Sequence, residues 1–155
     1  MFENILVPLD GSELAASILP QVVELCQKCN SRLTLLHVCR PEETGESAPS
    51  RPAVFPDEQR LCEAYLALIG KDLQGQGIEV AWACVKGIPA KAIIDYADQH
   101  KMDLIALATH GKGEVAWLLG STAEKVVTHA TVPVMLFRIL YREPPLLKGQ
   151  LKEFI

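Results

Sequence analysis

Five short apolar runs alternate along the chain with stretches in which apolar residues recur at every third or fourth position. A continuous apolar run is typical of a strand buried on both faces, whereas a spacing of three and four marks one face of a helix. We therefore expect strands over residues 4–7, 32–38, 78–85, 104–108 and 132–137. This alternation predicts an α/β protein of three layers, α/β/α, in which helices cover both faces of a five-stranded parallel sheet.

The helices are expected in the intervals between these strands. Pro20 lies inside the first helical pattern, and because proline removes one helix hydrogen bond, we expect a kink or a restart there. The second helix is expected over residues 57–74, the third begins near Pro89, and the fourth covers residues 122–130. Residues 40–56 are rich in Pro, Glu, Ser and Gly, which predicts a long loop.

The stretch of residues 104–122 carries the strongest candidate for ligand binding. Gly111 and Gly113 follow the expected strand, and they let a loop turn sharply and expose its N–H groups. Ser121 with Glu124 three residues later is a capping-box signature, so we expect Ser121 to cap a helix whose N-terminus attracts anions. Two interpretations stay open: an anion cradle for a nucleotide, or an ordinary connection between a strand and a helix.

Asp10 lies at the carboxyl end of the first expected strand. Ligands of such folds bind outside the carboxyl ends of the strands, where the strand order reverses. Asp10 and the loop at Gly111 are therefore expected in one crevice. An alternative role for Asp10 is to order its own turn through its side chain.

Length and charge narrow the function classes. A chain of 155 residues favours a single domain, which we place at residues 1–138, and residues 139–155 form a tail that is either a short amphipathic helix or a frayed end. A net charge of -4 argues against a nucleic-acid-binding protein, whose binding surface is basic. No apolar run is long enough to cross a bilayer, and the first residues lack a basic signal region, so the expectation is a cytoplasmic protein without a membrane partner.

The five cysteines are expected to be reduced in that compartment. Cys26 and Cys29 form a lone C-x-x-C, which we interpret as two small apolar residues on a helix rather than a redox or metal motif. His37 is interpreted as a hydrogen-bonded strand histidine rather than a metal ligand, and no metal site is predicted.

Four segments in order resemble the universal stress protein family: residues 5–12 (ILVPLDGS), 35–38 (LLHV), 87–90 (GIPA), and the stretch from Asp103 to Ser121. The resemblance covers residues 1–137. It implies a flavodoxin-like (Rossmann-like) fold, a homodimer formed through the last strand, and a role in the stress response with a regulatory protein partner of unknown identity.

The resemblance also implies ATP or AMP as the ligand, with Mg²⁺ accompanying ATP. It places adenine near Val38, adenosine near Asp10 and phosphates on the glycine loop, where Lys112 is either a phosphate partner or a solvated side chain. The candidate binding residues are Pro8, Asp10, Val38, Ala108, His110, Gly111, Lys112, Gly113, Gly120, Ser121 and Thr122.

The glycine loop departs from the pattern of nucleotide-binding members, which is Gly, two residues, Gly, nine residues, then Gly with Ser or Thr. Here Ala108 stands at the first glycine position, and eight residues separate Gly111 from Gly120. A shorter loop displaces its N–H donors, and hydrogen bonds tolerate little displacement. The alternative function is therefore a dimeric interaction module that works without nucleotide.

The sequence assigns no catalytic residue. His110 adjoins the loop but has no evident carboxylate to orient it, so slow ATP hydrolysis is the most that we expect.

Overall fold

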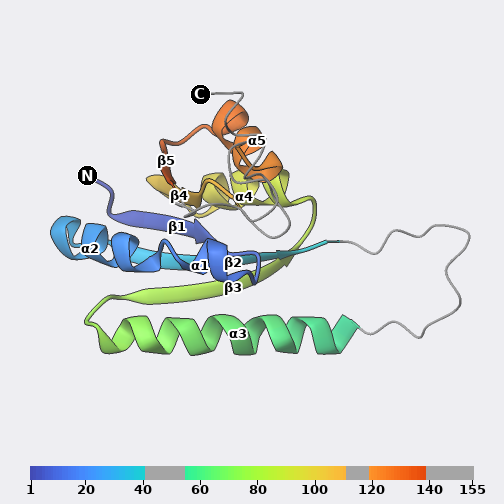
Figure 1. The fold of residues 1–155 in the computed structure, drawn as a ribbon, viewed down its shortest axis with the longest axis horizontal. Helices are drawn as coiled ribbons and strands as arrows, with labels where there is room; N and C mark the ends of the chain where they lie inside the picture. Colours follow the sequence, from blue (N-terminus) through green and yellow to red (C-terminus); the bar gives the residue numbers. More distant parts are fainter. Residues whose placement is uncertain (41–54, 111–118, 139–155) are drawn as a thin grey trace, which may run out of the picture.

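The computed structural model describes residues 1–40, 55–110 and 119–138. Strands and helices alternate along these segments, as Figure 1 shows. The strands are β1 (Asn4–Pro8), β2 (Arg32–Cys39), β3 (Val80–Lys86), β4 (Leu104–Ala108) and β5 (Val134–Phe137). The helices are α1 (Glu13–Ala16), α2 (Leu19–Cys29), α3 (Phe55–Gly75), α4 (Pro89–Gln99) and α5 (Ser121–His129).

All five strands are parallel and follow the order β3-β2-β1-β4-β5. The flavodoxin-like, Rossmann-like α/β fold is thereby confirmed. The chain winds outward from β1 in one direction and then, from β4, in the other. The order therefore reverses between β1 and β4, and this is where such sheets bind ligands.

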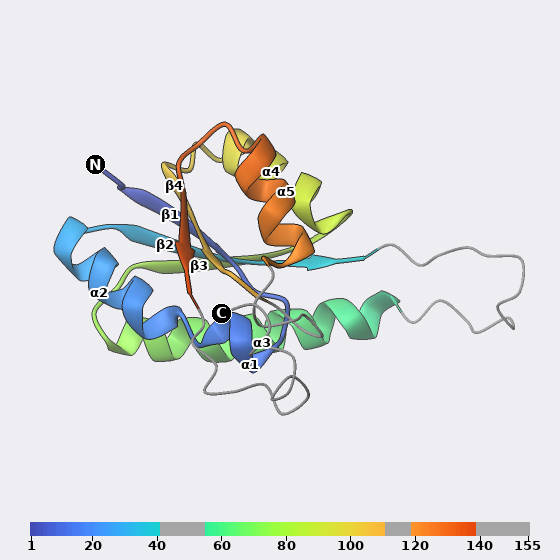
Figure 2. The ribbon, with the colours of Figure 1, turned by 45° about the horizontal axis from the view of Figure 1, so that its top comes forward.

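The sheet separates two hydrophobic layers, which can be followed in Figures 1 and 2. One layer packs α1, α2 and α3 on one face of the sheet, through buried residues that include Val7, Leu35 and Leu66. The other packs α4 and α5 on the opposite face, through residues that include Leu6 and Ile105. Adjacent residues of β1 and β4 point to opposite layers, so all of β4 and the three central residues of β1 are buried, and both strands are continuous apolar runs.

The first helical pattern is interrupted, as Pro20 predicts. It divides into α1, which ends at Ala16, and α2, which begins at Leu19 with Pro20 in its first turn. Proline is tolerated there because the first N–H groups of a helix have no partner within it. Asn30 ends α2 in the left-handed conformation, with φ 52°.

Helix α3 is joined to β3 by a disulfide between Cys62 and Cys84, whose Cα atoms are 6.5 Å apart. The expectation that every cysteine is reduced is therefore wrong. The bond was not foreseeable from the sequence, because the helix and the strand face each other only once the sheet is assembled. Cys26, Cys29 and Cys39 are free thiols, and Cys26 is buried on α2 as expected.

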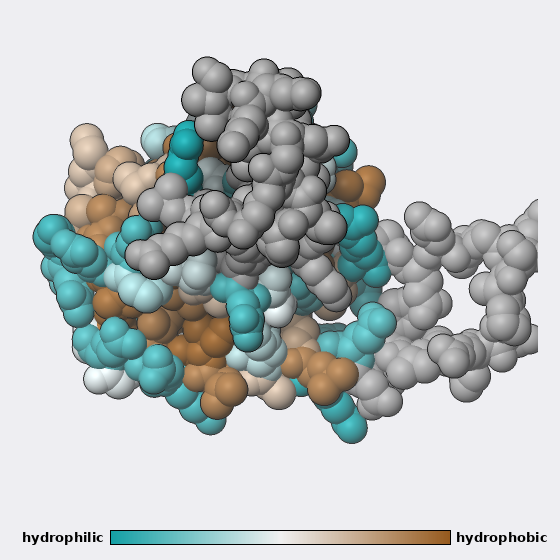
Figure 3. All heavy atoms as spheres, viewed as in Figure 1, coloured by the Kyte–Doolittle hydropathy of each residue, from teal (hydrophilic) through white to brown (hydrophobic). Residues whose placement is uncertain are grey.

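Helix α3 also approaches β3 closely at Gly70. A Cβ on Gly70 would lie 2.4 Å from Cε3 of Trp82, so only glycine leaves room for the indole at this point of the helix. The opposite side of α3 is partly apolar, since Leu61 and Leu68 are 70% and 74% exposed. Apolar atoms appear in Figure 3 along the lower edge, where Figure 1 places α3.

Strand β5 forms one edge of the sheet, because within the described residues it pairs only with β4. Pro133 precedes β5, and its carbonyl accepts a hydrogen bond from the Ile105 N–H at 3.0 Å. A proline at the start of an edge strand agrees with its missing donor. Among the described residues, no helix combines the length and the apolar character that a membrane span requires.

Candidate functional site

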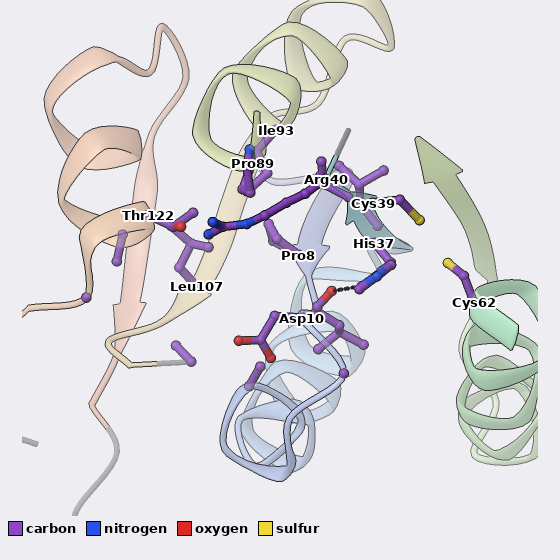
Figure 4. A pocket seen from close by; sticks show the side chains of 18 of the residues that line it. Pro8, Asp10, His37, Cys39, Arg40, Cys62, Pro89, Ile93, Leu107 and Thr122 are labelled. Atoms are coloured by element: carbon purple, nitrogen blue, oxygen red, sulfur yellow. Dashed lines mark hydrogen bonds between the residues drawn. The ribbon is translucent and has the colours of Figure 1, made fainter. Parts of the chain in front are cut away.

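A cavity of about 780 Å³ lies at the carboxyl ends of β1, β2 and β4, at the point where the strand order reverses. Figure 4 shows side chains from strands of the sheet and from α3, α4 and α5 converging on it. Seven of the predicted binding residues line this cavity: Pro8, Asp10, Val38, Ala108, His110, Gly120 and Thr122. Ser121 is not among the lining residues. Gly111, Lys112 and Gly113 lie outside the described residues.

Asp10 points into the cavity from the loop after β1 (Figure 4). Its Oδ1 accepts hydrogen bonds from the Ser12 backbone N–H at 2.9 Å and from the Ser12 hydroxyl. The Ser12 hydroxyl oxygen in turn accepts the Ala15 N–H at 3.1 Å, in the first turn of α1. Asp10 thus orders its own turn, which was the alternative role, while its carboxylate also faces the cavity. The two roles are compatible because a carboxylate oxygen accepts more than one hydrogen bond.

The start of α5 forms a second wall. The Gly120 N–H donates to the Thr109 carbonyl at 2.9 Å, and the Gly120 carbonyl accepts the Glu124 N–H at 2.8 Å. Gly120 is therefore the cap residue and Ser121 the first residue of the helix, so the prediction that Ser121 caps α5 is wrong. The physical reason is the bond to Thr109, which fixes the backbone one residue earlier than the capping-box pattern implies. Gly120, Thr122 and Ala123 line the cavity, so the positive end of the α5 dipole still faces it.

His110 is a polar side chain in a buried position, with an exposed fraction of 6%. Its Nδ1 lies 2.8 Å from the Thr109 hydroxyl oxygen. Its Nε2 is buried and has no hydrogen-bond partner among the described residues. Because a buried polar atom without a partner is costly, Nε2 is a candidate contact for a polar ligand atom.

The wall on the α4 side is apolar. Val38 and Leu107 come from the sheet, and Pro89 and Ile93 come from the first turns of α4. Ala108 ends β4 with an exposed fraction of 9% and contributes its Cβ to the lining. A mostly apolar cavity with a few converging polar groups is the usual character of a small-molecule site.

Arg40 is a cavity residue that the sequence reading assigned to the loop of residues 40–56. It follows β2, and Figure 4 shows its side chain reaching across the cavity toward Thr122 and Leu107. A guanidinium is always charged and matches phosphate geometry. Its place in the cavity could have been expected from the sequence, because Arg40 directly follows β2, and β2 ends at the same edge of the sheet as β1.

The α3 side of the cavity carries Cys39, Cys62, Glu58 and Tyr65. Burial raises the pKa of the Cys39 thiol, and the Glu58 carboxylate acts in the same direction. Burial also raises the pKa of Tyr65, to which the charge of Asp10 contributes. The Cys39 thiol and the Tyr65 phenol are therefore neutral at physiological pH.

A family model described as the universal stress protein family matches residues 1–138. A universal stress protein of Thermus aquaticus, named for its position in the QAH/OAS sulfhydrylase 3′ region, is 34% identical over 145 residues, which cover 89% of this chain and 100% of that protein. The solved structure of MJ0577, a universal stress protein of Methanocaldococcus jannaschii, superposes with a TM-score of 0.79 at 27% identity, covering 91% of this chain and 99% of that one. A universal stress protein from Archaeoglobus fulgidus in complex with dAMP shares the fold, with a TM-score of 0.65 at 17% identity over 88% of this chain and 98% of that one.

Fold and cavity define a doubly wound α/β protein with a cavity at the reversal of strand order. The chain belongs to the universal stress protein family.

Proposed function

We propose that this chain is a dimeric regulator of the stress response that binds an adenine nucleotide, ATP or AMP, in the cavity between β1 and β4. The observation that carries the proposal is the convergence of Asp10, Val38, Gly120 and Thr122 on one cavity of about 780 Å³. Ligand pockets for small molecules measure about 300–1,000 Å³, so the volume suits a nucleotide. The dAMP complex of a family member with this fold agrees with the ligand class.

The residues present fit the chemistry of a nucleotide. Val38, Pro89 and Ile93 provide an apolar wall for a base, and Asp10 provides an acceptor for sugar hydroxyls. The N-terminus of α5 and the guanidinium of Arg40 provide donors and positive charge for phosphate. The unpartnered Nε2 of His110 is one further polar contact. Mg²⁺ belongs to the proposal only with ATP, whose phosphates supply ligands to that ion.

The first test is the ligand that copurifies with the protein. Freshly purified protein is denatured, and the supernatant is analysed by nucleotide chromatography with mass detection. Stoichiometric ATP or AMP supports the proposal. An empty supernatant, together with no heat and no shift of melting temperature on adding millimolar ATP, ADP or AMP, refutes it.

Two matched pairs of variants separate the parts of the site. Asp10→Ala is expected to weaken binding of both adenosine and ATP about 10- to 100-fold, as for loss of a hydrogen bond to a charged group. Asp95→Ala, which removes an exposed carboxylate of α4 paired with Lys91, is the control and leaves binding unchanged. Equal affinity in both variants would remove Asp10 from the site.

Arg40→Gln tests the phosphate contact. It is expected to weaken the binding of ATP at least tenfold and to leave the affinity for adenosine unchanged, because only the phosphates contact the guanidinium. Arg32→Gln is the control, since Arg32 pairs with Glu79 at the opposite end of β2. Titration calorimetry with both ligands measures the difference, and an equal loss for adenosine would contradict the assignment.

The dimer is proposed to form through β5, an edge strand whose Leu136 is 37% exposed. Leu136→Lys is expected to give a monomer by light scattering. Val127→Lys changes an exposed apolar residue of α5 in the same way and is expected to leave the dimer intact. A wild-type monomer at tens of micromolar would refute the dimer.

A nucleotide-independent interaction module is the second candidate. It is favoured by Ala108, whose Cβ lines the cavity where nucleotide-binding members have glycine, and by the hydrogen bonds with which Asp10 orders its own turn. Saturable ATP binding that Asp10→Ala abolishes would exclude it. For both candidate functions we propose no catalytic residue, and we expect ATP hydrolysis, if measured, to be slow.

A further inference from the structure

His37, Cys39 and Cys62 form a cluster of metal-ligating side chains at the α3 side of the cavity. One imidazole nitrogen of His37 and the two Sγ atoms lie within 4.8 Å of one another. His37 and Cys39 are two residues apart on β2, so they share one face of the strand, and α3 presents Cys62 to that face. Figure 4 shows the two sulfur atoms facing each other beside the His37 ring.

The tautomer of His37 suits a metal ligand. Its Nδ1 lies 2.7 Å from the Leu9 carbonyl oxygen, which can only accept, so Nδ1 carries the proton. The lone pair is therefore on Nε2. Metal-binding histidines commonly donate their other N–H to a backbone carbonyl in this way, because the bond fixes the tautomer and orients the ring.

We propose that His37 Nε2, Cys39 Sγ and Cys62 Sγ bind a thiophilic divalent metal ion of the Zn²⁺ class when the Cys62–Cys84 disulfide is reduced. A tetrahedral ion with metal–sulfur bonds of about 2.3 Å holds its sulfur ligands about 3.8 Å apart. A nitrogen and a sulfur ligand lie about 3.5 Å apart, so the ligand atoms, now within 4.8 Å of one another, need to approach by roughly 1 Å. Imidazole and thiolate are the ligands that this class of ion prefers.

The disulfide decides whether the site exists, because Cys62 has no free thiolate while it is bonded to Cys84. Reduction by a dithiol transfers two electrons and two protons to the Cys62–Cys84 bond, giving two thiols, and the dithiol becomes a disulfide. Metal binding then releases the protons of Cys39 and Cys62 to the solvent. The proposed site is thus closed in the oxidised protein and open in the reduced protein.

The fourth coordination position faces the cavity, because all three ligands are lining residues. Cys84 does not line the cavity, so we assign that position to water rather than to Cys84. Three protein ligands and one open position are the pattern of zinc sites that take an exogenous ligand. This inference does not depend on nucleotide binding.

The test is a titration of the full-length protein with Co²⁺ and then Zn²⁺ in nucleotide-free buffer. The protein is either fully oxidised or reduced with a phosphine, which is not a thiol ligand. The reduced protein is expected to bind one Co²⁺ per chain with sulfur-to-cobalt charge-transfer absorption, which Zn²⁺ then abolishes. The oxidised protein is expected to show no such absorption. Its absence from the reduced protein, or its presence in both forms, would overturn the proposal.

Variants assign the ligands. Cys39→Ser and His37→Asn are each expected to remove stoichiometric binding by the reduced protein, whereas Cys29→Ser, in the C-x-x-C of α2, is expected to retain it. If Cys29→Ser lost metal binding while Cys39→Ser retained it, the metal would lie on α2 and the proposal would be overturned.

Cys84→Ser leaves Cys62 as a free thiol without any reductant. It is expected to bind one Co²⁺ without prior reduction, with circular dichroism confirming the fold. Failure of the folded Cys84→Ser variant to bind would overturn the open fourth position, and the wild-type titration remains decisive if the variant does not fold.

Discussion

The two sides of the sheet are built from different kinds of contact. The α1–α3 layer contains four of the five cysteines, Cys26, Cys39, Cys62 and Cys84, together with the close approach of Trp82 to Gly70. The α4–α5 layer contains no cysteine and is filled by aliphatic side chains such as Leu6, Ile93 and Ile105. The sheet between them is common to both.

This difference shows that the two layers respond to different conditions. A layer without thiols depends on burial, which redox state scarcely changes. A layer that contains thiols and a disulfide depends on redox state as well. We therefore expect reduction to affect α2 and α3 before it affects α4 and α5.

Reduction of the Cys62–Cys84 disulfide is expected to have the largest effect on stability. The bond spans 22 residues, and a loop of about this length stabilises by about 3 kcal/mol in the chain-entropy model. Urea denaturation with and without a phosphine reductant, in the presence of a chelator, measures the difference. Hydrogen exchange should accelerate most in α3, and the least in α4.

The control is Cys62→Ala/Cys84→Ala, whose urea midpoint should not respond to reductant. If reduction left the wild-type midpoint unchanged, or if α4 exchanged as fast as α3, the two layers would not differ in the way that we describe.

Gly70→Ala is expected to cost about 1–3 kcal/mol, as overpacking does, because its Cβ would meet the Trp82 ring at 2.4 Å. Gly75→Ala, in the same helix, meets no atom within 4 Å and is expected to change stability by about 0.5 kcal/mol or less. Thermal and urea unfolding measure both variants. A Gly70→Ala protein as stable as Gly75→Ala would mean that α3 does not pack tightly on β3.

Alkaline pH gives the smallest effect. Burial raises the pKa of the Cys26 thiol from its ordinary 9.0 to about 11, and Cys29 adds in the same direction. The unfolded chain releases this proton near pH 9, so between pH 9 and 11 the folded state holds more protons and its free energy of unfolding falls as pH rises. A shift of about two pKa units corresponds to about 2.8 kcal/mol as an upper limit, and solvent screening lowers the expected loss to about 1–2 kcal/mol.

Cys26→Ala should remove this contribution and flatten the dependence over the same window, whatever the variant costs at neutral pH. Urea denaturation of both proteins at several pH values measures the slopes. If the free energy of unfolding fell equally with pH in both proteins, Cys26 would not be the group responsible.

Much of the fold was predictable from the sequence, because apolar periodicity reports burial directly. All five strands were located, and Pro20 correctly predicted the restart between α1 and α2. The limits differ by one or two residues, as at β3, which begins at Val80 rather than at residue 78. Strand order and the Cys62–Cys84 pair were not predictable, because both depend on contacts between segments distant in sequence.

The location of the site at the strand ends was predictable, whereas the roles of several side chains were not. Asp10 and Gly120 follow from their places at the ends of elements. Arg40 was missed because its composition placed it in a loop, and Ser121 was assigned the cap because a local pattern cannot include the Thr109 bond to Gly120. Cys39 was overlooked as a companion of His37, although the two are only two residues apart on one strand.

The hydrogen bonds from Asp10 through Ser12 to Ala15 also connect the lining of the cavity to helix α1. Helix α1 has only four residues, so the bond at Ala15 is a large share of what fixes its first turn. A movement of the Asp10 carboxylate is therefore transmitted to α1 within five residues of chain. A ligand that displaced the Asp10 carboxylate would therefore also shift α1, whose Ala15 lines the same cavity.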